Sequence, residues 1–378
     1  MRDAAERVLE LAGEAGFALA GIASAEPSDR ADAVREWVAA GRHGTMAWLA
    51  NHLDVRLDPG LLLPGARSVI AVCDAYHAEA AGPGTTGGGE ASAEADDGRA
   101  RGRVARYAWG DDYHRLMKKR LHGLADTLAA AYPGATFRTA VDTAPALERE
   151  LASRAGLGWQ GKNTMMIHPR HGSYTLLGLV ATTLPLPTSA ELDYPAVPGG
   201  GRTVDAVDRC ANCTRCIDAC PTGAIAATGY SLDASRCVSY LTIEHRGVIE
   251  DALLPGVGDW LAGCDVCQEV CPYNEVGRRN PLPVRDEYSP MPRGLDRGLD
   301  LVELMSWTAE DRAGAFRGSA LKRIKLDMLR RNAVVVAGNL LTEREDPALR
   351  AAVRRCLEDE SGLVRATAEQ VVARWAAG

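Results

Sequence analysis

The sequence lacks any run of about 18 apolar residues, so we expect no helix that crosses a membrane. Its first residues, MRDAAE, are charged and contain neither a twin arginine nor the apolar core of a secretory signal. These two absences predict a cytoplasmic protein without a membrane partner. The net charge of −7 excludes a protein that binds polyanions over its whole surface, so any nucleic-acid site must be a local cationic patch.

Cysteine is concentrated in one stretch, because eight of the ten cysteines lie between residues 210 and 272. They are Cys210, Cys213, Cys216 and Cys220 (followed by Pro221), then Cys237, then Cys264, Cys267 and Cys271 (followed by Pro272). The opening run has the spacing of a bacterial ferredoxin, in which three thiolates hold one cluster and the fourth reaches a second. Soft thiolate ligands favour iron–sulfur clusters over hard cations. The eight thiolates match the requirement of two 4Fe–4S clusters.

Disulfides and a zinc site are the two alternative uses of these cysteines. Disulfides are typical of small secreted domains, and we see no signal peptide in this chain of 378 residues. Zinc usually takes two pairs of ligands rather than four cysteines closed by a proline. The remaining cysteines, Cys73 in a predicted strand and Cys356 in a predicted helix, are expected to be core residues.

The length predicts two or three domains in an α+β chain. Residues 1–190 mix helices with strands, and the strands are expected at residues 17–23, 67–72, 135–141, 164–167 and 174–183. The main helices there are expected at residues 1–16, 112–131 and 145–155. Residues 191–293 form the predicted ferredoxin-type domain. Residues 294–378 are helical in pattern, and two similar pieces indicate a short HEAT-like repeat.

Residues 79–103 consist mainly of Gly, Ala, Thr, Glu and Asp, a composition typical of a disordered surface insertion. The G-x-G-x-x-G pattern at Gly156, Gly158 and Gly161 follows a predicted helix and precedes a predicted strand. A dinucleotide-binding loop has the opposite order, so we do not expect this loop to bind a nucleotide.

Asp142 ends a predicted strand just ahead of a predicted helix. Its carboxylate can cap that helix, or it can donate a proton if burial against an apolar cofactor raises its pKa. The residues alone leave both interpretations open. His114, in the sequence DYH, matches part of a cobalamin-binding D-x-H-x-x-G signature whose glycine is missing, so we expect an ordinary helix histidine.

A cluster of six cations lies within 15 residues near the C-terminus, opposed only by Asp327. A solvated helix face and a phosphate-binding surface both fit this cluster. Its concentration on an acidic protein favours binding to a phosphate backbone. The members are Arg317, Lys322, Arg323, Lys325, Arg330 and Arg331, and the spacing of Arg323 and Arg330 predicts a shared helix stripe.

Together these stretches resemble the epoxyqueuosine reductase family of tRNA-modifying enzymes. The resemblance covers the chain except residues 79–103. Its carriers are long and gap-free: RLDP from Arg56, LPGARSV from Leu63, ARYA from Ala105, DYH from Asp112, VDTAP from Val141, GWQGKN from Gly158, the cysteine window with CVSYLTIEHRG from Cys237, and RRNA from Arg330.

The resemblance implies an N-terminal cobalamin-binding α/β domain similar to that of reductive dehalogenases, a ferredoxin-like domain with two 4Fe–4S clusters, and C-terminal HEAT-like repeats that bind tRNA. It implies reduction of epoxyqueuosine to queuosine at the wobble position of tRNAs for aspartate, asparagine, histidine and tyrosine. Electrons would pass through the clusters to a base-off cobalamin. We expect a monomer that is served by an electron donor such as a flavodoxin or a ferredoxin.

Carried over residue by residue, the resemblance makes Asp142 the proton donor. It implies that Arg56, Lys162, Asn163 and Ser239, with Asp142, lie at the cobalamin or its access path. It assigns Cys210, Cys213, Cys216 and Cys271 to one cluster, and Cys220, Cys237, Cys264 and Cys267 to the other. Arg246 joins the six C-terminal cations as an expected tRNA contact.

Two other functions were considered for the same residues. One is a soluble corrinoid reductive dehalogenase, against which the missing twin arginine and the basic helical tail count. The other is a non-enzymatic electron carrier of the ferredoxin type.

Overall fold

The computed structural model describes residues 1–76, 98–197, 200–290 and 293–377. A four-stranded antiparallel sheet organises the N-terminal part, in the order β1 (Leu19–Ser24), β2 (Ser68–Ala75), β7 (Thr175–Thr182), β4 (Phe137–Ala140). All eight residues of β2 are buried, which is the pattern of a strand covered on both faces. The apolar runs had predicted each of these strands, and the structure confirms them.

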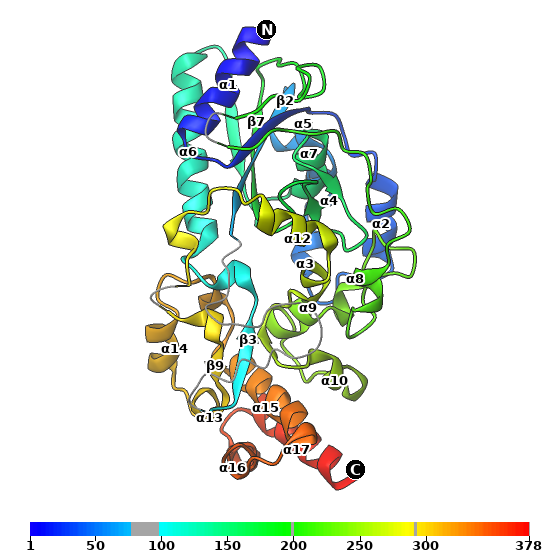
Figure 1. Cartoon of the computed structure of the whole chain (residues 1–378), viewed down its shortest axis with the longest axis vertical. Helices are drawn as coiled ribbons and strands as arrows, with labels where there is room; N and C mark the ends of the chain where they lie inside the picture. Colours follow the sequence, from blue (N-terminus) through cyan, green and yellow to red (C-terminus); the bar gives the residue numbers. More distant parts are fainter. Residues whose placement is uncertain (77–97, 198–199, 291–292, 378) are drawn as a thin grey trace.

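Helices cover both faces of this sheet (Figure 1). On one face α1 (Arg2–Glu14) and α6 (Tyr113–Ala131) pack against Ile70, Val72 and Val180. On the other face α7 (Glu148–Arg154) packs against Val69, Ala71 and Leu179. Strand residues alternate between the two cores because successive side chains point to opposite faces. The short helices that link β1 to β2 are α2 (Ala31–Ala39), α3 (Ala47–Ala50), α4 (Leu53–Leu57) and α5 (Pro59–Leu62).

Two elements near the sheet differ from the sequence prediction. The helix expected from residue 145 begins at Glu148. The strand expected at residues 164–167 is reduced to β6 (Met166–Ile167), which pairs with β5 (Trp159–Gln160) in a small hairpin. In the G-x-G-x-x-G stretch, a Cβ on Gly158 would lie 2.2 Å from the carbonyl oxygen of Ile167. Close packing within the hairpin therefore explains that glycine.

The cysteine-rich segment contains only short elements. They are α8 (Arg215–Asp218), α9 (Val238–Ile243), α10 (Leu254–Val257), β8 (Trp260–Ala262), α11 (Val266–Glu269) and α12 (Pro272–Arg279). Pro272 opens α12 at its first position, where a missing N–H costs nothing. The cysteines thus lie on turns and at the ends of short helices.

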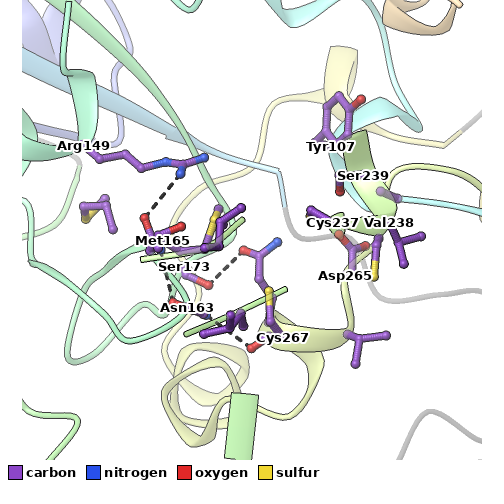
Figure 2. A pocket seen from close by; sticks show the side chains of 18 of the residues that line it. Tyr107, Arg149, Asn163, Met165, Ser173, Cys237, Val238, Ser239, Asp265 and Cys267 are labelled. Atoms are coloured by element: carbon purple, nitrogen blue, oxygen red, sulfur yellow. Dashed lines mark hydrogen bonds between the residues drawn. The ribbon is translucent and has the colours of Figure 1, made fainter. Parts of the chain in front are cut away.

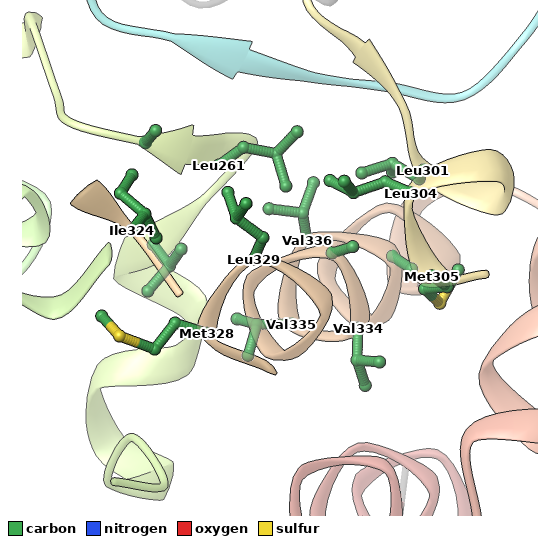
Figure 3. Close-up of a cluster of buried hydrophobic side chains, with 14 of the residues drawn as sticks. Leu261, Leu301, Leu304, Met305, Ile324, Met328, Leu329, Val334, Val335 and Val336 are labelled. Atoms are coloured by element: carbon green, nitrogen blue, oxygen red, sulfur yellow. The ribbon is translucent and has the colours of Figure 1, made fainter. Parts of the chain in front are cut away.

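The C-terminal part is helical, as the sequence predicted: α13 (Leu301–Met305), α14 (Ala309–Ala315), α15 (Leu326–Glu343), α16 (Pro347–Arg355) and α17 (Gly362–Ala377). Helix α15 is central, with 12 of its 18 residues buried. Figure 3 shows Leu329 and Val336 of α15 facing Leu261 of the cysteine-rich segment and Leu304 of α13. No helix among the described residues is both long enough and apolar enough to span a membrane.

Strand β3 (Arg101–Val104) joins the parts of the chain, because it lies between β8 and β9 (Leu299–Asp300). The prediction that disorder extends to residue 103 is therefore wrong at its C-terminal end, while residues 77–97 lie outside the described part. A Cβ on Gly102 would lie 2.4 Å from Cγ of Leu261. This glycine permits close packing and does not mark a flexible tail.

Candidate active site

A cavity of about 340 Å³ lies between the N-terminal sheet and the cysteine-rich segment (Figure 2). This volume is at the lower end of the range of ligand pockets. On one side it is lined by Asp142, Glu148 and residues of the hairpin and β7. On the other side it is lined by the start of α9 and by several cysteines. Aromatic and aliphatic side chains such as Tyr107, Leu176 and Val238 provide apolar surface between them.

Four cysteines line this cavity, and they are the set that the resemblance assigns to one cluster: Cys220, Cys237, Cys264 and Cys267. Burial is the largest cause of the raised pKa of Cys237, Cys264 and Cys267, and neighbouring thiols of the same set raise it further. Thiolates this close repel one another unless a cation compensates their charge. The donor set therefore suits an iron–sulfur cluster.

The other four cysteines, Cys210, Cys213, Cys216 and Cys271, form a second group outside the cavity lining. Burial raises the pKa of Cys216 to about 11, and Cys210, Cys271 and Cys213 contribute in that order. Across the described residues, no three His, Cys, Asp or Glu side chains are close enough to bind one metal ion together. A cubane holds its ligands further apart than a single ion does, because its iron and sulfide atoms lie between them. The two groups follow the predicted division, although ligation itself stays a prediction.

The β5–β6 hairpin holds both cysteine loops. Lys162 Nζ donates to the carbonyl oxygens of Ala211, at 2.6 Å, and Cys213, at 3.1 Å. Asn163 Nδ2 donates to the carbonyl oxygen of Cys267 at 3.3 Å. Of these two hairpin residues only Asn163 lines the cavity, so a place for Lys162 at the cofactor or its access path stays a prediction. Lys162 supports the loop of the cysteine group outside the cavity.

Of the two other predicted cofactor contacts, Ser239 and Arg56, only one lines the cavity. Ser239 lines the cavity at the start of α9. Arg56 lies behind the Asp142 loop, where it donates to the carbonyl oxygen of Ala146 at 3.4 Å, and it does not line the cavity. Burial lowers the pKa of Arg56, while the charges of Glu148 and Asp142 act to raise it. A direct contact from Arg56 to a ligand in the cavity is therefore not supported.

Asp142 follows β4 with a backbone φ of +44°, in the left-handed region that aspartate tolerates better than most residues. Its side chain is 46 % exposed, and Oδ2 lies 2.7 Å from Nε2 of His114 on α6. His114 Nδ1 lies 2.7 Å from Oδ1 of Asp112, whose Oδ2 lies 2.9 Å from Nζ of Lys322. The cap of α7 is Leu147, so the helix-cap interpretation of Asp142 is wrong. Instead, Asp142 ends a polar chain of four side chains.

The charges of these four side chains determine which of them holds the proton shared by His114 and Asp142. Burial acts to lower the pKa of His114, but the hydrogen bonds with Asp112 and Asp142 outweigh it and raise the pKa. Burial is the largest single cause and acts to raise the pKa of Asp142, but the hydrogen bond and charge of His114, the charge of Arg323 and the hydrogen bond of Tyr113 together outweigh it and lower the pKa. The expectation that burial raises the pKa of Asp142 is therefore wrong in this structure. The proton of the pair resides on His114, next to an ionised Asp142.

Sequence reasoning missed two residues of this site, His114 as a partner of Asp142 and Glu148. Glu148 lines the cavity and accepts a hydrogen bond from the backbone N–H of Asp142. Burial and then the charge of Asp142 raise the pKa of Glu148 to about 8. The sequence offered one signal for Glu148, its position six residues after Asp142. Acidic residues are also common in the first turn of a helix, so this signal did not distinguish a site residue.

Most of the predicted cationic residues are exposed: Arg246, Arg317, Lys322, Arg323 and Lys325. Arg323 is close enough to Asp142 for its charge to lower the pKa of that carboxyl. Lys322 is 51 % exposed although it pairs with Asp112. Arg323 and Lys322 therefore lie beside the hydrogen-bonded side chains of Asp142, His114 and Asp112.

Arg330 and Arg331 do not belong to that surface. Arg331 is 0 % exposed, and its guanidinium donates to the carbonyl oxygens of Leu241, His245 and Gly247. Arg330 pairs with the buried Asp359. The expectation that Arg331 contacts RNA is wrong, because α15 is the central helix of its core. Nor do Arg323 and Arg330 share a helix, since Arg323 ends a 3-10 turn (Ala320–Arg323) and α15 begins at Leu326.

Comparison with known families gives two matches within the chain. The family described as "Epoxyqueuosine reductase QueG, DUF1730" matches residues 56–143. The family described as "4Fe-4S double cluster binding domain" matches residues 209–274. The second match spans all eight cysteines of the two groups.

Curated relatives match over nearly the whole length. An epoxyqueuosine reductase of Xanthomonas campestris is 39% identical over 363 residues, which cover 96% of this chain and 94% of the relative. Its counterpart in Burkholderia pseudomallei is 38% identical and covers 97% and 90%.

Solved structures of epoxyqueuosine reductases are also similar to this chain over nearly their whole length. An epoxyqueuosine reductase with a tRNA-Tyr epoxyqueuosine-modified stem loop is 26% identical, with a TM-score of 0.75 and 97% of both chains covered. The Bacillus subtilis enzyme, with its catalytic aspartate loop swung out of the active site, is 25% identical with a TM-score of 0.75 and covers 97% of this chain and 98% of its own.

Proposed function

Because the chain belongs to the epoxyqueuosine reductase family, we propose that it reduces the epoxide of epoxyqueuosine to queuosine at the wobble position of tRNA. One observation carries this proposal. A single cavity has Asp142 on one wall and the thiols of Cys220, Cys237, Cys264 and Cys267 on the other. Protons and electrons can therefore reach the same enclosed space, as a reductive cleavage requires.

The proposed cofactors are two 4Fe–4S clusters, one on each group of four cysteines, and a cobalamin in the cavity. When bound, they supply the two electrons of the reduction. Tyr107, Leu176 and Val238 would offer apolar contacts to a bound corrin ring, and Asn163 and Ser239 would offer polar contacts.

In the proposed reaction Asp142 relays the proton held by His114 to the epoxide oxygen. The 2.7 Å contact between Asp142 Oδ2 and His114 Nε2 supports this transfer. Asp112 and Lys322 hold the imidazole from the other side. A base in an anticodon loop is already single-stranded, so it can be turned out into the cavity at little cost.

For tRNA binding we propose the exposed cations Arg246, Arg317, Lys322, Arg323 and Lys325. The charge of Arg323 reaches Asp142, so phosphates bound by these cations would bring an anticodon loop to the cavity. A relative solved with a tRNA-Tyr stem loop supports a tRNA substrate, and we propose the tRNAs for aspartate, asparagine, histidine and tyrosine. In this proposal the C-terminal helices are HEAT-like repeats.

The remaining parts of the proposal concern the whole molecule. We propose three parts with boundaries near residues 190 and 293, of which the first resembles the cobalamin-binding domain of reductive dehalogenases. A flavodoxin or a ferredoxin would supply electrons to the cysteine-rich part. The protein would act as a monomer in the cytoplasm.

Nucleoside analysis of bulk tRNA tests this function in cells. A bacterium that lacks its own epoxyqueuosine reductase should accumulate epoxyqueuosine, and expression of this chain should replace it with queuosine. The matched control is Asp142→Asn, which keeps the shape of the side chain but carries no acidic proton. Persistent epoxyqueuosine with the unaltered chain, at full iron and cobalamin content, would contradict the proposal.

A further inference from the structure

The reduction of an epoxide to an alkene consumes two protons. Both carbon–oxygen bonds break, two electrons enter, and the oxygen leaves as water only when it has received two protons. The pair of His114 and Asp142 shares one proton, so it delivers one proton before it must be recharged. If the proposed function is correct, the site therefore needs a second proton source beside Asp142.

We propose that Glu148 is the donor of the second proton. Glu148 and Asp142 line the same cavity, and Glu148 Oε1 accepts the backbone N–H of Asp142, so the two residues are in direct contact. In the proposed order, Asp142 protonates the epoxide oxygen as the first carbon–oxygen bond breaks. Glu148 then protonates the resulting hydroxyl group as the second bond breaks, and the oxygen leaves as water.

The surroundings of Glu148 keep a proton on it. The charged groups that act on it are Asp142 from the loop after β4, Arg149 from its own helix α7 and Arg56 from α4. The hydroxyl of Tyr113 on α6 is also close enough to sense the charge of Glu148. Burial and the Asp142 charge outweigh the two arginines and raise the pKa of Glu148 to about 8. The pKa of Asp142 is lowered in the same site, so Glu148 is the one of these two carboxyls that keeps its own proton at neutral pH.

A purely structural role for Glu148 makes a different prediction. Its hydrogen bond holds the backbone of Asp142, which has a φ of +44° and needs support in that conformation. Glu148→Gln keeps an acceptor oxygen for this N–H but has no proton to give. Glu148→Ala removes both. The two variants together separate proton donation from support of the loop.

The experiment is single-turnover reduction of an epoxyqueuosine-containing stem loop by the reconstituted, full-length enzyme across about pH 6 to pH 9.5. We expect Glu148→Gln to slow the reaction by about 10²–10⁴-fold at neutral pH, and Glu148→Ala to be at least as slow. Above about pH 8 the unaltered enzyme should lose rate about tenfold per pH unit as Glu148 loses its proton, in addition to the loss that follows deprotonation of His114. Glu148→Gln should lack the loss that begins near pH 8 and keep only the loss that follows deprotonation of His114.

Two results of this assay have opposite meanings. A Glu148→Gln enzyme with the rate and pH profile of the unaltered protein would overturn the proposal, and a slow Glu148→Ala enzyme beside it would assign Glu148 to the loop alone. An unaltered enzyme that does not convert the substrate at all would instead contradict the proposed function.

Thermal unfolding tests, without any turnover, whether Glu148 is protonated at neutral pH. The unfolded chain releases the Glu148 proton near pH 4.3, whereas the folded protein keeps it up to about pH 8, so this group destabilises the fold increasingly between those values. Glutamine has no such effect. The difference in Tm between Glu148→Gln and the unaltered protein should therefore shift in favour of the variant from about pH 5 to pH 8 and stay level above it. A difference that does not change with pH would show that Glu148 holds no proton at neutral pH.

Discussion

The titratable groups on the two walls of the cavity differ in the direction of their pKa shifts. On the wall formed by the N-terminal sheet, Asp142, His114 and Glu148 are hydrogen-bonded to one another, and their pKa values shift in different directions. On the opposite wall, Cys237, Cys264 and Cys267 all have raised pKa values, because each is buried and surrounded by like groups. The first arrangement stores and moves protons. The second suits a bound cluster, so in the proposed reaction protons come from one wall and electrons from the other.

The largest effect should come from the thiol wall. In Cys264→Ser we expect no measurable turnover and a fall from about eight to about four iron atoms per chain, because one cluster loses a ligand. Iron analysis after anaerobic reconstitution measures this change. Cys356→Ala is the matched control, since Cys356 is a core residue outside both groups and its loss should leave iron content unchanged. An iron content of about eight atoms per chain in Cys264→Ser would contradict the assignment of a cluster to this wall.

The next largest effect should come from the proton wall. Asp142→Asn should reduce single-turnover rate by about 10²–10⁴-fold while iron and cobalamin contents stay unchanged, because the amide fits the site but donates no acidic proton. Asp126→Asn, at an exposed position on α6, controls for the loss of a carboxylate. A fully active Asp142→Asn enzyme would contradict the role of Asp142.

A smaller effect should follow from the far end of the polar chain. Asp112→Asn removes the carboxylate that, with Asp142, raises the pKa of His114, so that pKa should fall. His114 then loses its proton at a lower pH, and the alkaline loss of activity should begin at a lower pH than in the unaltered enzyme. A loss of about tenfold at neutral pH is expected. An unchanged pH profile would show that Asp112 has no influence on the proton of His114.

The smallest effect on the chemical step should come from the cationic surface beside the proton wall. Arg323→Glu with Lys325→Glu should weaken binding of the tRNA stem loop and reduce its salt dependence by a slope of about 1 per lost phosphate contact. The reduction rate at saturating stem loop should change little. Arg354→Glu with Arg355→Glu, on the exposed face of α16, makes the same change of charge elsewhere. If both pairs weaken binding equally, the location of the cations has no importance.

The parts that could be predicted from the sequence depend on local signals. The thiol spacing is a direct requirement of cluster ligation, and the apolar runs of β2 and β7 show strands that are buried on both faces. Strand β3 was missed because its partners β8 and β9 are remote in the chain. The burial of Arg331 depends on the central position of α15, which six cations in 15 residues did not reveal.

At the Asp142 site, the position of the carboxyl could be predicted from the sequence but the pKa shifts could not. Its position after a strand was predictable, but the direction of its pKa shift was not, because His114 comes from a helix that packs beside it only in the folded protein. The raised pKa of Glu148 likewise requires both burial and the nearby charge of Asp142. Titration behaviour therefore followed from the tertiary structure.

The central claim is that the two walls act together on an epoxide in a tRNA loop. The direct measurement is mass analysis of an epoxyqueuosine stem loop after anaerobic incubation with the reconstituted, chemically reduced protein. We predict a product nucleoside lighter by one oxygen atom, formed by the unaltered protein and lost in Asp142→Asn and in Cys264→Ser. An unchanged nucleoside with the unaltered protein, at about eight iron atoms and one cobalamin per chain, would contradict the account.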